Sequence, residues 1–254
     1  MFKRLNNLEG KVAVITGGYG AVGQATAKKL AAQKCRVVLL IRSKLEEASD
    51  FAKSLDNQEL GHLVLYCDIT KSDTINEAAA QVKQQAGGCN ILINSASITQ
   101  NIHPKQLSLL TDEIFDSIVT TNLRGVFATI RAFAPMLRET NDGLIINISS
   151  GSAITANDSN LAYVASKGGL NSITASLGRA LAPVIRVLSI VPGVMETPTS
   201  GAIRNPGVNE KQAEITPLKR IGIADDVADT VEACCTHIRF ATGTCFVVDG
   251  GRTA

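Results

Sequence analysis

Residues 11–23 read Lys11-Val12-Ala13-Val14-Ile15-Thr16-Gly17-Gly18-Tyr19-Gly20-Ala21-Val22-Gly23. The apolar run that ends at Thr16 is short and stops at glycines, so it predicts a buried strand that leads into a tight turn. Apolar residues then recur with helical spacing from Val22 to Ala32, which predicts a helix directly after the glycines. Such a turn suits a pyrophosphate, because glycines let backbone N–H groups approach the phosphates and the helix N-terminus adds partial positive charge. The alternative is a tight turn that binds nothing.

The same alternation of strand and helix patterns continues along the chain. Further strands are expected at 36–41, 62–67, 91–94 and 144–148, and helices at 45–55, 72–84, 111–138 and from about 161. Strands that alternate with helices predict an α/β fold with a doubly wound parallel sheet flanked by helices. No repeat or Pro/Ser-rich linker interrupts the pattern, so residues 1–254 are expected to form a single domain.

The composition limits the classes of protein. The 254 residues are 45% hydrophobic and 19% charged, which is enough for one well-buried core. A formal net charge of +2 gives no strong field, so neither nucleic acid nor a membrane is an expected partner. The six cysteines lack C-x-x-C spacing, so no metal site is expected and the thiols are interpreted as reduced. No segment has the pattern of a signal peptide or a membrane span, so a cytoplasmic location is expected.

Tyr163 and Lys167 are the candidate proton-transfer pair. They lie four residues apart in a predicted helix, so both side chains project from one face, about one turn apart. A phenol ordinarily titrates near pH ~10, and a nearby cation favours its ionised form. Unit charges about 4 Å apart interact by roughly 4 kcal/mol at an effective dielectric of about 20. This is enough for general acid/base chemistry near neutral pH.

Polar residues follow several of the predicted strands. In a parallel sheet the carboxyl ends of the strands meet at one edge, where ligands bind. Ser150, at the end of strand 144–148, can hold a substrate oxygen against the Tyr163 hydroxyl, although a serine after a strand is often only a turn residue. Asp68, after strand 62–67, is either a ligand contact or the turn acid of Asp68-Ile69-Thr70-Lys71, and the sequence favours neither.

Taken together, these motifs resemble the short-chain dehydrogenase/reductase family over essentially the whole chain. Thr16, Gly17 and Gly23 match the family's Thr-Gly-x3-Gly-x-Gly turn. Ser150 lies thirteen residues before Tyr163, as the family's catalytic serine does. The tail at 242–251 is similar to that of bacterial 3-oxoacyl-carrier-protein reductases. The resemblance implies a Rossmann-type fold with a dinucleotide-binding half at about 8–150 and a catalytic and substrate-covering half at about 150–254.

The resemblance also implies a role for each site residue. Tyr163 would exchange the oxygen-bound proton and Ser150 would orient that oxygen. Lys167 would lower the pKa of Tyr163 and hold the nicotinamide ribose, while Asn122, in Thr121-Asn122-Leu123, would support a proton-relaying water. The implied cofactor-binding residues are Thr16, Gly17, Gly18, Tyr19, Gly20, Ala21, Val22, Gly23, Arg42, Ser43, Asp68, Ile69, Asn94, Ser95, Ala96, Tyr163, Lys167, Pro192, Gly193 and Thr197.

Four residues depart from the family's pattern. Ala21 replaces the middle glycine of the turn, so the chain also satisfies a second dinucleotide spacing, Gly18-x-Gly20-x-x-Gly23. Ser95 and Ser97 replace an asparagine and a glycine that are expected beside the ribose. Leu188 stands where the family usually has asparagine. These changes concern local geometry, since the four catalytic positions hold the expected residue types.

The end of the second strand predicts the choice of nicotinamide. NAD-specific sites place Asp or Glu there to bind the adenosine ribose 2′-hydroxyl, whereas this chain has Ile41, Arg42 and Ser43. A guanidinium at Arg42 can bind a 2′-phosphate, with Ser43 as a second donor, so NADP(H) is favoured over NAD(H). The alternative is a solvated arginine at a strand end.

The substrate class stays open. The resemblance favours a 3-oxoacyl thioester or similar ketone, and the substrate could be carrier-bound. A sugar, steroid or polyol dehydrogenase of the same family, or a nicotinamide-sensing regulatory protein without turnover, are the alternatives. The glycine- and proline-rich region from Val194 to about Leu218 is interpreted as a mobile cover over the substrate. Resemblance alone implies a homotetramer.

Overall fold

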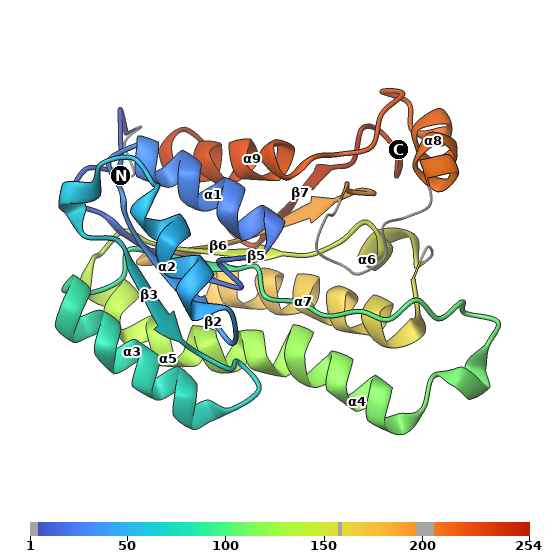
Figure 1. The fold of residues 1–254 in the computed structure, drawn as a ribbon, viewed down its shortest axis with the longest axis horizontal. Helices are drawn as coiled ribbons and strands as arrows, with labels where there is room; N and C mark the ends of the chain where they lie inside the picture. Colours follow the sequence, from blue (N-terminus) through green and yellow to red (C-terminus); the bar gives the residue numbers. More distant parts are fainter. Residues whose placement is uncertain (1–4, 157–158, 197–205) are drawn as a thin grey trace.

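A seven-stranded sheet forms the centre of the computed structural model, which describes residues 5–156, 159–196 and 206–254 (Figure 1). Every pairing is parallel and the strand order is β3-β2-β1-β4-β5-β6-β7. The strands are β1 (Val12–Thr16), β2 (Arg36–Ile41), β3 (Leu63–Tyr66), β4 (Ile91–Asn94), β5 (Gly143–Ile148), β6 (Ile185–Pro192) and β7 (Thr244–Val248). This confirms the predicted doubly wound parallel sheet.

Helices cover both faces of the sheet (Figure 1). The α-helices are α1 (Ala21–Ala32), α2 (Leu45–Lys53), α3 (Ser72–Ala86), α4 (Asp112–Val119), α5 (Val126–Glu139), α6 (Ser152–Thr155), α7 (Leu161–Ala180), α8 (Pro206–Ile215) and α9 (Ala224–Thr236). Short 3₁₀ turns lie at η1 (Gln58–Leu60) and η2 (Leu107–Leu109). Helices α3, α5 and α7 pack against one face of the sheet, and α1, α2 and α9 pack against the other.

The strands are apolar runs because they are buried on both faces. All five residues of β1 are buried, and successive residues enter opposite layers: Val14 packs on the α3/α5/α7 side and Ile15 on the α1/α9 side. The same rule explains Leu188. It is 0% exposed in β6 and belongs to the α1/α9 layer, so this departure from the family's pattern is a core residue.

The predicted elements differ from the observed ones mainly at their ends. The strand expected at 62–67 is shorter, and the helix expected at 45–55 ends at Lys53. The region expected to be helical at 111–138 is divided by a π-helical segment, η3 (Thr120–Gly125), between α4 and α5. Gly125 is required there, because a Cβ would lie 2.6 Å from the carbonyl oxygen of Ile69. Single π turns of this kind are frequent at functional sites.

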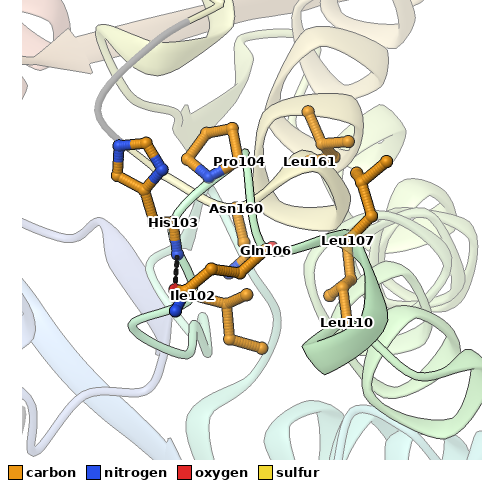
Figure 2. Close-up of a pocket in the computed structure, with 8 residues that line it drawn as sticks. All are labelled: Ile102, His103, Pro104, Gln106, Leu107, Leu110, Asn160 and Leu161. Carbon is orange, nitrogen blue, oxygen red and sulfur yellow. Dashed lines mark hydrogen bonds between the residues drawn. The ribbon is translucent and has the colours of Figure 1, made fainter.

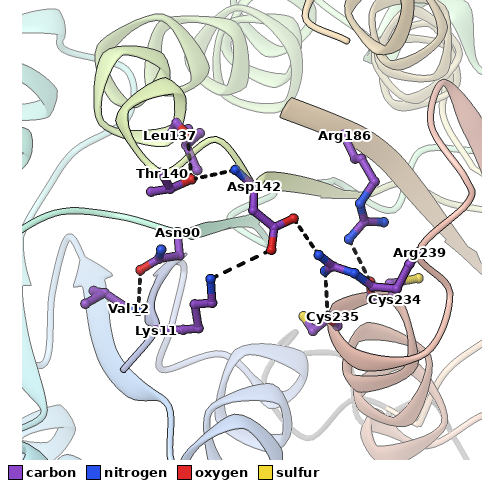
Figure 3. A network of polar contacts seen from close by, with 10 residues as sticks. All are labelled: Lys11, Val12, Asn90, Leu137, Thr140, Asp142, Arg186, Cys234, Cys235 and Arg239. Carbon is purple, nitrogen blue, oxygen red and sulfur yellow. Dashed lines mark hydrogen bonds and ion pairs between the residues drawn. The ribbon is translucent and has the colours of Figure 1, made fainter. Parts of the chain in front are cut away.

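A polar network lies at the amino ends of the central strands (Figure 3). Arg186 donates to the carbonyls of Cys234 (3.1 Å) and Ile238 (3.0 Å), and Arg239 donates to the carbonyl of Cys235 (3.1 Å). These carbonyls lie at the C-terminal end of α9, where backbone acceptors lack helical partners and cations are favourable. Asp142 accepts from Arg239 and pairs with Lys11, so one carboxylate balances a strongly positive cluster.

The six cysteines are free thiols, and Cys35, Cys67, Cys89, Cys234 and Cys235 are buried. Burial raises the pKa of Cys35 to about 12 and that of Cys234 to about 11, so these thiols stay protonated and unreactive. Among the described residues, no group of His, Cys, Asp and Glu side chains is arranged to hold a metal ion. In the same part of the chain, no helix combines the length and apolar character needed to cross a membrane.

Asp142→Ala is expected to destabilise the fold, because it removes the carboxylate that pairs with Lys11 and Arg239 and leaves their positive charges unbalanced. We expect the free energy of unfolding to fall by about 2–3 kcal/mol, less than for a fully buried pair because the Asp142 side chain is 23% exposed. Urea unfolding followed by circular dichroism measures the change. The control is Asp50→Ala, whose pair with Lys53 is exposed on both sides and should contribute less than about 0.5 kcal/mol. Equal effects of the two variants would contradict this account.

Candidate active site at the carboxyl edge of the sheet

The glycine turn after β1 has the shape of a phosphate cradle. Gly17 has φ +63°, and a Cβ there would lie 2.8 Å from the Cα of Ala96. A Cβ at Gly23 would lie 2.5 Å from the carbonyl oxygen of Gly17. Both positions therefore require glycine. Helix α1 begins directly after Gly20, with no side-chain cap and no acidic residue in its first turn, so its N-terminal N–H groups suit a pyrophosphate.

Ala21 is the first residue of α1, and Gly20 is its N-cap in an extended conformation. A helical first residue carries a methyl without strain, so the turn tolerates this departure. Gly18 is also constrained, since a Cβ would lie 2.8 Å from the Leu39 side chain and 3.1 Å from the Ile15 carbonyl oxygen. Tyr19 packs edge-on against Phe51, with ring centroids 6.2 Å apart. Val22 is partly buried against the α1/α9 layer.

The strand order reverses between β1 and β4, and the glycine turn meets the end of β4 at that point. Thr16 pairs with Asn94, and the Thr16 hydroxyl accepts a hydrogen bond from the Ala96 N–H at 3.3 Å. Asn94 is 1% exposed and donates to the Asn147 side chain at 2.8 Å, while Ser95 is partly buried. Crevices at such reversals are where open α/β sheets bind their ligands. The structure therefore brings together the glycine turn and 94–96, as predicted from the sequence.

Asp68 is tied into a local turn after β3. Its Oδ1 accepts from the Thr70 N–H (3.0 Å) and the Thr70 hydroxyl (2.7 Å). Burial raises the pKa of Asp68, but these hydrogen bonds and the charges of Arg42 and Lys71 outweigh burial and hold it below the usual value. Asp68 therefore has the turn role that the sequence left open, and the contact of Asp68 and its neighbour Ile69 with the cofactor stays a prediction.

Lys167 is a buried cation. It is 2% exposed, and its ammonium donates to the carbonyl oxygen of Ile148, the last residue of β5, at 2.8 Å. Burial lowers the pKa of Lys167 to about 8. The ammonium lies 5.6 Å from the centre of the Tyr163 ring. The two side chains therefore share one face of α7, as their spacing predicted.

Tyr163 is surrounded by hydroxyl groups. Burial raises the pKa of Tyr163, and hydrogen bonds from Ser150 and Ser97 partly oppose that rise. The pKa of Tyr163 is thus raised overall, the ammonium of Lys167 is held by the Ile148 carbonyl, and the lowering effect expected of Lys167 on Tyr163 stays a prediction. Ser150 follows β5, and its hydroxyl also accepts from the Ser152 N–H at 3.3 Å. The predicted pair of Ser150 and Tyr163 is thus brought together by the structure.

Asn122 lies in the π segment and is 0% exposed. Its amide donates to the Ile98 carbonyl and accepts from the Ile98 N–H, both at 2.8 Å, and also donates to the Ser166 hydroxyl at 3.3 Å. The Asn122 side chain thus holds the segment after β4, and its support of a proton-relaying water stays a prediction.

Two residues of the site were missed by the sequence analysis. Asn160 caps α7 by accepting from the Tyr163 N–H at 2.8 Å, and it donates to the carbonyl of Gln100 at 2.7 Å. An Asn directly before an apolar helical pattern is an N-cap signal that could have identified it. The second is Ser97. It was expected beside the ribose, and its side chain lowers the pKa of Tyr163 against the effect of burial.

A small pocket lies beside these residues (Figure 2). Its walls are mainly apolar and come from the loop that contains Ile102, Leu107 and Leu110 and from Leu161 at the start of α7, with Asn160 at its back. Leu107 is 65% exposed and Leu161 is 41% exposed, so the pocket opens to solvent. Asn160, the cap of α7, lines this pocket, whereas Ser150, Tyr163 and Lys167 do not.

The remaining predicted site residues come from the end of β6. Pro192 accepts through its carbonyl from the Gly151 N–H at 2.7 Å, which places it beside Ser150. A Cβ at Gly193 would lie 2.8 Å from the Cα of Asp249. Thr197 and the 197–205 part of the expected cover lie outside the described residues. The described part of that region is anchored at Gly222, whose N–H donates to the Val194 carbonyl at 2.8 Å, and continues through α8.

The parallel sheet, the glycine cradle and the Ser150/Tyr163/Lys167 cluster define a dinucleotide-binding oxidoreductase. A family model described as enoyl-(acyl carrier protein) reductase matches residues 19–253. The chain is 29% identical to a putative ketoacyl reductase of the granaticin polyketide synthase from Streptomyces violaceoruber, covering 96% of both chains. It is 30% identical to the 2-(R)-hydroxypropyl-CoM dehydrogenase of Xanthobacter autotrophicus, covering 96% of this chain and 99% of the other.

A crystal structure titled as a short-chain dehydrogenase/reductase of the glucose/ribitol dehydrogenase type from Brucella melitensis superimposes with a TM-score of 0.89. It shares 28% identity and covers 98% of this chain and 99% of its own. The chain belongs to the short-chain dehydrogenase/reductase family.

Lys167→Met is expected to stabilise the fold near neutral pH. Because burial lowers the pKa of Lys167 from 10.5 to about 8, the unfolded chain binds this proton more tightly. The charge therefore destabilises the fold by about 3 kcal/mol near pH ~7, and losing the bond to Ile148 offsets about 1 kcal/mol of the gain. The penalty is complete below about pH 8 and vanishes towards about pH 10.5, so the advantage of the variant should shrink over that range.

Urea unfolding of wild type and Lys167→Met at several pH values measures this difference. The control is Lys105→Met, at an exposed lysine, which should leave stability unchanged at every pH. If the difference in the free energy of unfolding between wild type and Lys167→Met stays constant across the pH range, the buried charge of Lys167 does not destabilise the fold.

Proposed function

We propose that this oxidoreductase transfers a hydride between the nicotinamide of NADP(H) and a carbonyl or alcohol carbon, most favourably to reduce a 3-oxoacyl thioester or a similar ketone. Members of the family act on CH–OH or C=O groups with a nicotinamide cofactor. The observation that carries the proposal is the meeting of the Tyr163 and Ser150 hydroxyls beside the buried ammonium of Lys167.

The residues of the cradle fit the cofactor. Gly17, Gly18 and Gly23 leave room for a phosphate backbone, and the uncapped N-terminus of α1 supplies N–H donors. Pro192 and Gly193 would flank the nicotinamide, and Lys167 would hold its ribose. When bound, the nicotinamide supplies or accepts the hydride.

The protonation state of Tyr163 favours reduction. Since burial raises the pKa of Tyr163, the phenol is protonated at neutral pH and can give its proton to a carbonyl oxygen that becomes an alcohol. The Ser150 hydroxyl would hold and polarise that oxygen. Oxidation of an alcohol needs the phenolate instead, which is favoured at high pH.

The substrate class is supported by two of the relatives. The granaticin relative is named as a ketoacyl reductase, and a 27% identical protein of Staphylococcus epidermidis is named as a 3-oxoacyl-[acyl-carrier-protein] reductase. The Xanthobacter relative is named for a hydroxypropyl-CoM substrate, so other alcohols, including sugars, steroids and polyols, remain the second candidate class. A sensing protein without turnover is disfavoured by the complete set of catalytic residue types.

The choice of NADP(H) rests on Arg42. It follows β2 at the carboxyl edge of the sheet, its side chain is exposed, and its charge acts on Asp68 across the same edge. The preceding residue, Ile41, is 4% exposed and carries no acid that could repel a 2′-phosphate. Ser43 is exposed beside it and would be the second donor.

A cytoplasmic homotetramer is part of the same proposal. Phe115 on α4 and Phe127 on α5 are 38% and 42% exposed, and exposed aromatic residues on neighbouring helices support a contact between subunits. A carrier-bound substrate would approach the open side of the site, where Leu107 is exposed.

Tyr163→Phe is expected to bind NADPH normally and to lower turnover by about 10²–10⁴-fold, because it loses the acid that protonates the product oxygen. NADPH oxidation with acetoacetyl and crotonoyl thioesters, diketones and aldehydes measures turnover and separates C=O from C=C reduction. Tyr66→Phe is the control, since Tyr66 is 44% exposed at the surface. Near-normal turnover in Tyr163→Phe, or turnover of the crotonoyl thioester alone, would refute the assignment.

Arg42→Ala is expected to remove most of the preference for NADPH. One guanidinium–phosphate contact contributes roughly 1.5–3 kcal/mol, which corresponds to a preference of about tenfold to a hundredfold. The kcat/KM values for NADPH and NADH in wild type and variant measure it. Arg36→Ala, at the opposite end of the same strand, should leave the ratio unchanged. A wild type that prefers NADH would show that Arg42 is only a solvated side chain.

A further inference from the structure

Tyr163 lies in the first turn of its helix. Helix α7 begins at Leu161, so Tyr163 is its third residue, whereas Lys167 lies one turn further in and is 2% exposed. The first N–H groups of a helix have no partner within the helix, and helix ends fray most easily. The position of the phenol therefore depends on what holds the start of α7. A displacement of about 1 Å can lower the turnover of an enzyme by about 10²-fold.

The side chain of Asn160 joins this helix start to the segment after β4. It is 1% exposed, and its oxygen accepts from the Tyr163 N–H at 2.8 Å. Its amide donates to the Gln100 carbonyl at 2.7 Å and to the Thr99 hydroxyl at 3.3 Å. The same Gln100 carbonyl accepts from the Ile102 N–H at 3.0 Å, at the edge of the small pocket (Figure 2). Asn160 thus uses its acceptor for the helix and its donors for the neighbouring segment.

Asn122 makes a parallel connection. It binds the N–H and the carbonyl of Ile98, both at 2.8 Å, and donates to the Ser166 hydroxyl at 3.3 Å. That hydroxyl donates to the Tyr163 carbonyl at 2.8 Å. Both backbone polar groups of Tyr163 are therefore connected to the segment after β4. Asn160 connects the N–H, and Asn122 connects the carbonyl by way of Ser166.

We propose that Asn160 is a positioning residue for proton transfer, which fixes the first turn of α7 so that the Tyr163 phenol keeps its place relative to the ends of β4 and β5. This inference rests on the proposed role of Tyr163. An asparagine suits the position because one short side chain must both accept and donate, whereas an aspartate lacks the donors. Asn160 acts through the backbone of Tyr163 and does not itself exchange a proton.

Two variants of Asn160 test the proposal in ketone reduction with NADPH. Asn160→Ala removes the cap and the bonds to the neighbouring segment, and kcat should fall by about 10- to 100-fold. Asn160→Ser keeps a capping oxygen but loses the amide donors, so kcat should fall by less than about tenfold. The KM for NADPH should change by less than about twofold in both, because binding at the glycine turn is left intact. Thr111→Ala, which removes the N-cap of α4, is the matched control and should leave kcat unchanged.

Combining Asn160→Ala with Tyr163→Phe separates positioning of the phenol from general damage to the site. If Asn160 acts through the phenol, the double variant should keep the residual kcat of Tyr163→Phe to within about twofold. If the double variant instead loses a further 10-fold or so, Asn160 acts on another group and the inference is overturned.

Amide hydrogen exchange measures the same contact without turnover. The Tyr163 N–H should exchange at least about 10-fold faster in Asn160→Ala than in wild type, and close to the wild-type rate in Asn160→Ser, which retains an acceptor. If Tyr163→Phe lowers turnover while Asn160→Ala keeps the wild-type kcat, the inference fails and the proposed function stands. If Tyr163→Phe stays fully active, the proposed function fails, and hydrogen exchange still decides whether Asn160 fixes the start of α7.

Discussion

A row of buried polar side chains across the sheet aligns the site. Parallel pairing sets Thr16, Asn94, Asn147 and Ser189 side by side on β1, β4, β5 and β6, and each is at most 1% exposed. Asn147 donates to the Thr174 hydroxyl on α7 at 2.9 Å, so the row also fixes the helix that carries Tyr163 and Lys167. Buried polar groups destabilise a fold unless they are hydrogen-bonded. The strands and α7 are therefore most stable in the one register in which these side chains bond to one another.

The buried position of α7 determines the chemistry of its side chains. Lys167 is desolvated and held by a β5 carbonyl, and Tyr163 is desolvated among hydroxyl groups. Desolvation disfavours both the ammonium and the phenolate. Burial therefore opposes the lowering of a phenol's pKa that a nearby cation causes on a solvent-exposed helix. The phenol therefore stays protonated near neutral pH, and the Ser150 and Ser97 side chains partly oppose the effect of burial. This balance is why the exact neighbours of the Tyr163 oxygen matter.

The opposite edge of the sheet has a separate role. There Arg186 and Arg239 satisfy the last carbonyls of α9, and Asp142 balances their charge. The polar residues of that edge stabilise the fold, whereas those of the carboxyl edge surround Tyr163 and Lys167, the residues proposed to react. The two edges are separated by the length of the strands, so stability and chemistry can be altered independently.

The sequence by itself determined the strand–turn–helix order, the parallel sheet, the glycine turn and the spacing of Tyr163 and Lys167 on one helix face, because these depend on periodicity, local turns and spacing within one element. It could not determine the π turn at Asn122 or the clamp of Asn160 on the segment after β4. It also could not show how strongly burial raises the pKa of Tyr163. These features depend on how residues more than twenty positions apart meet and how much water they exclude, and only the tertiary structure decides both.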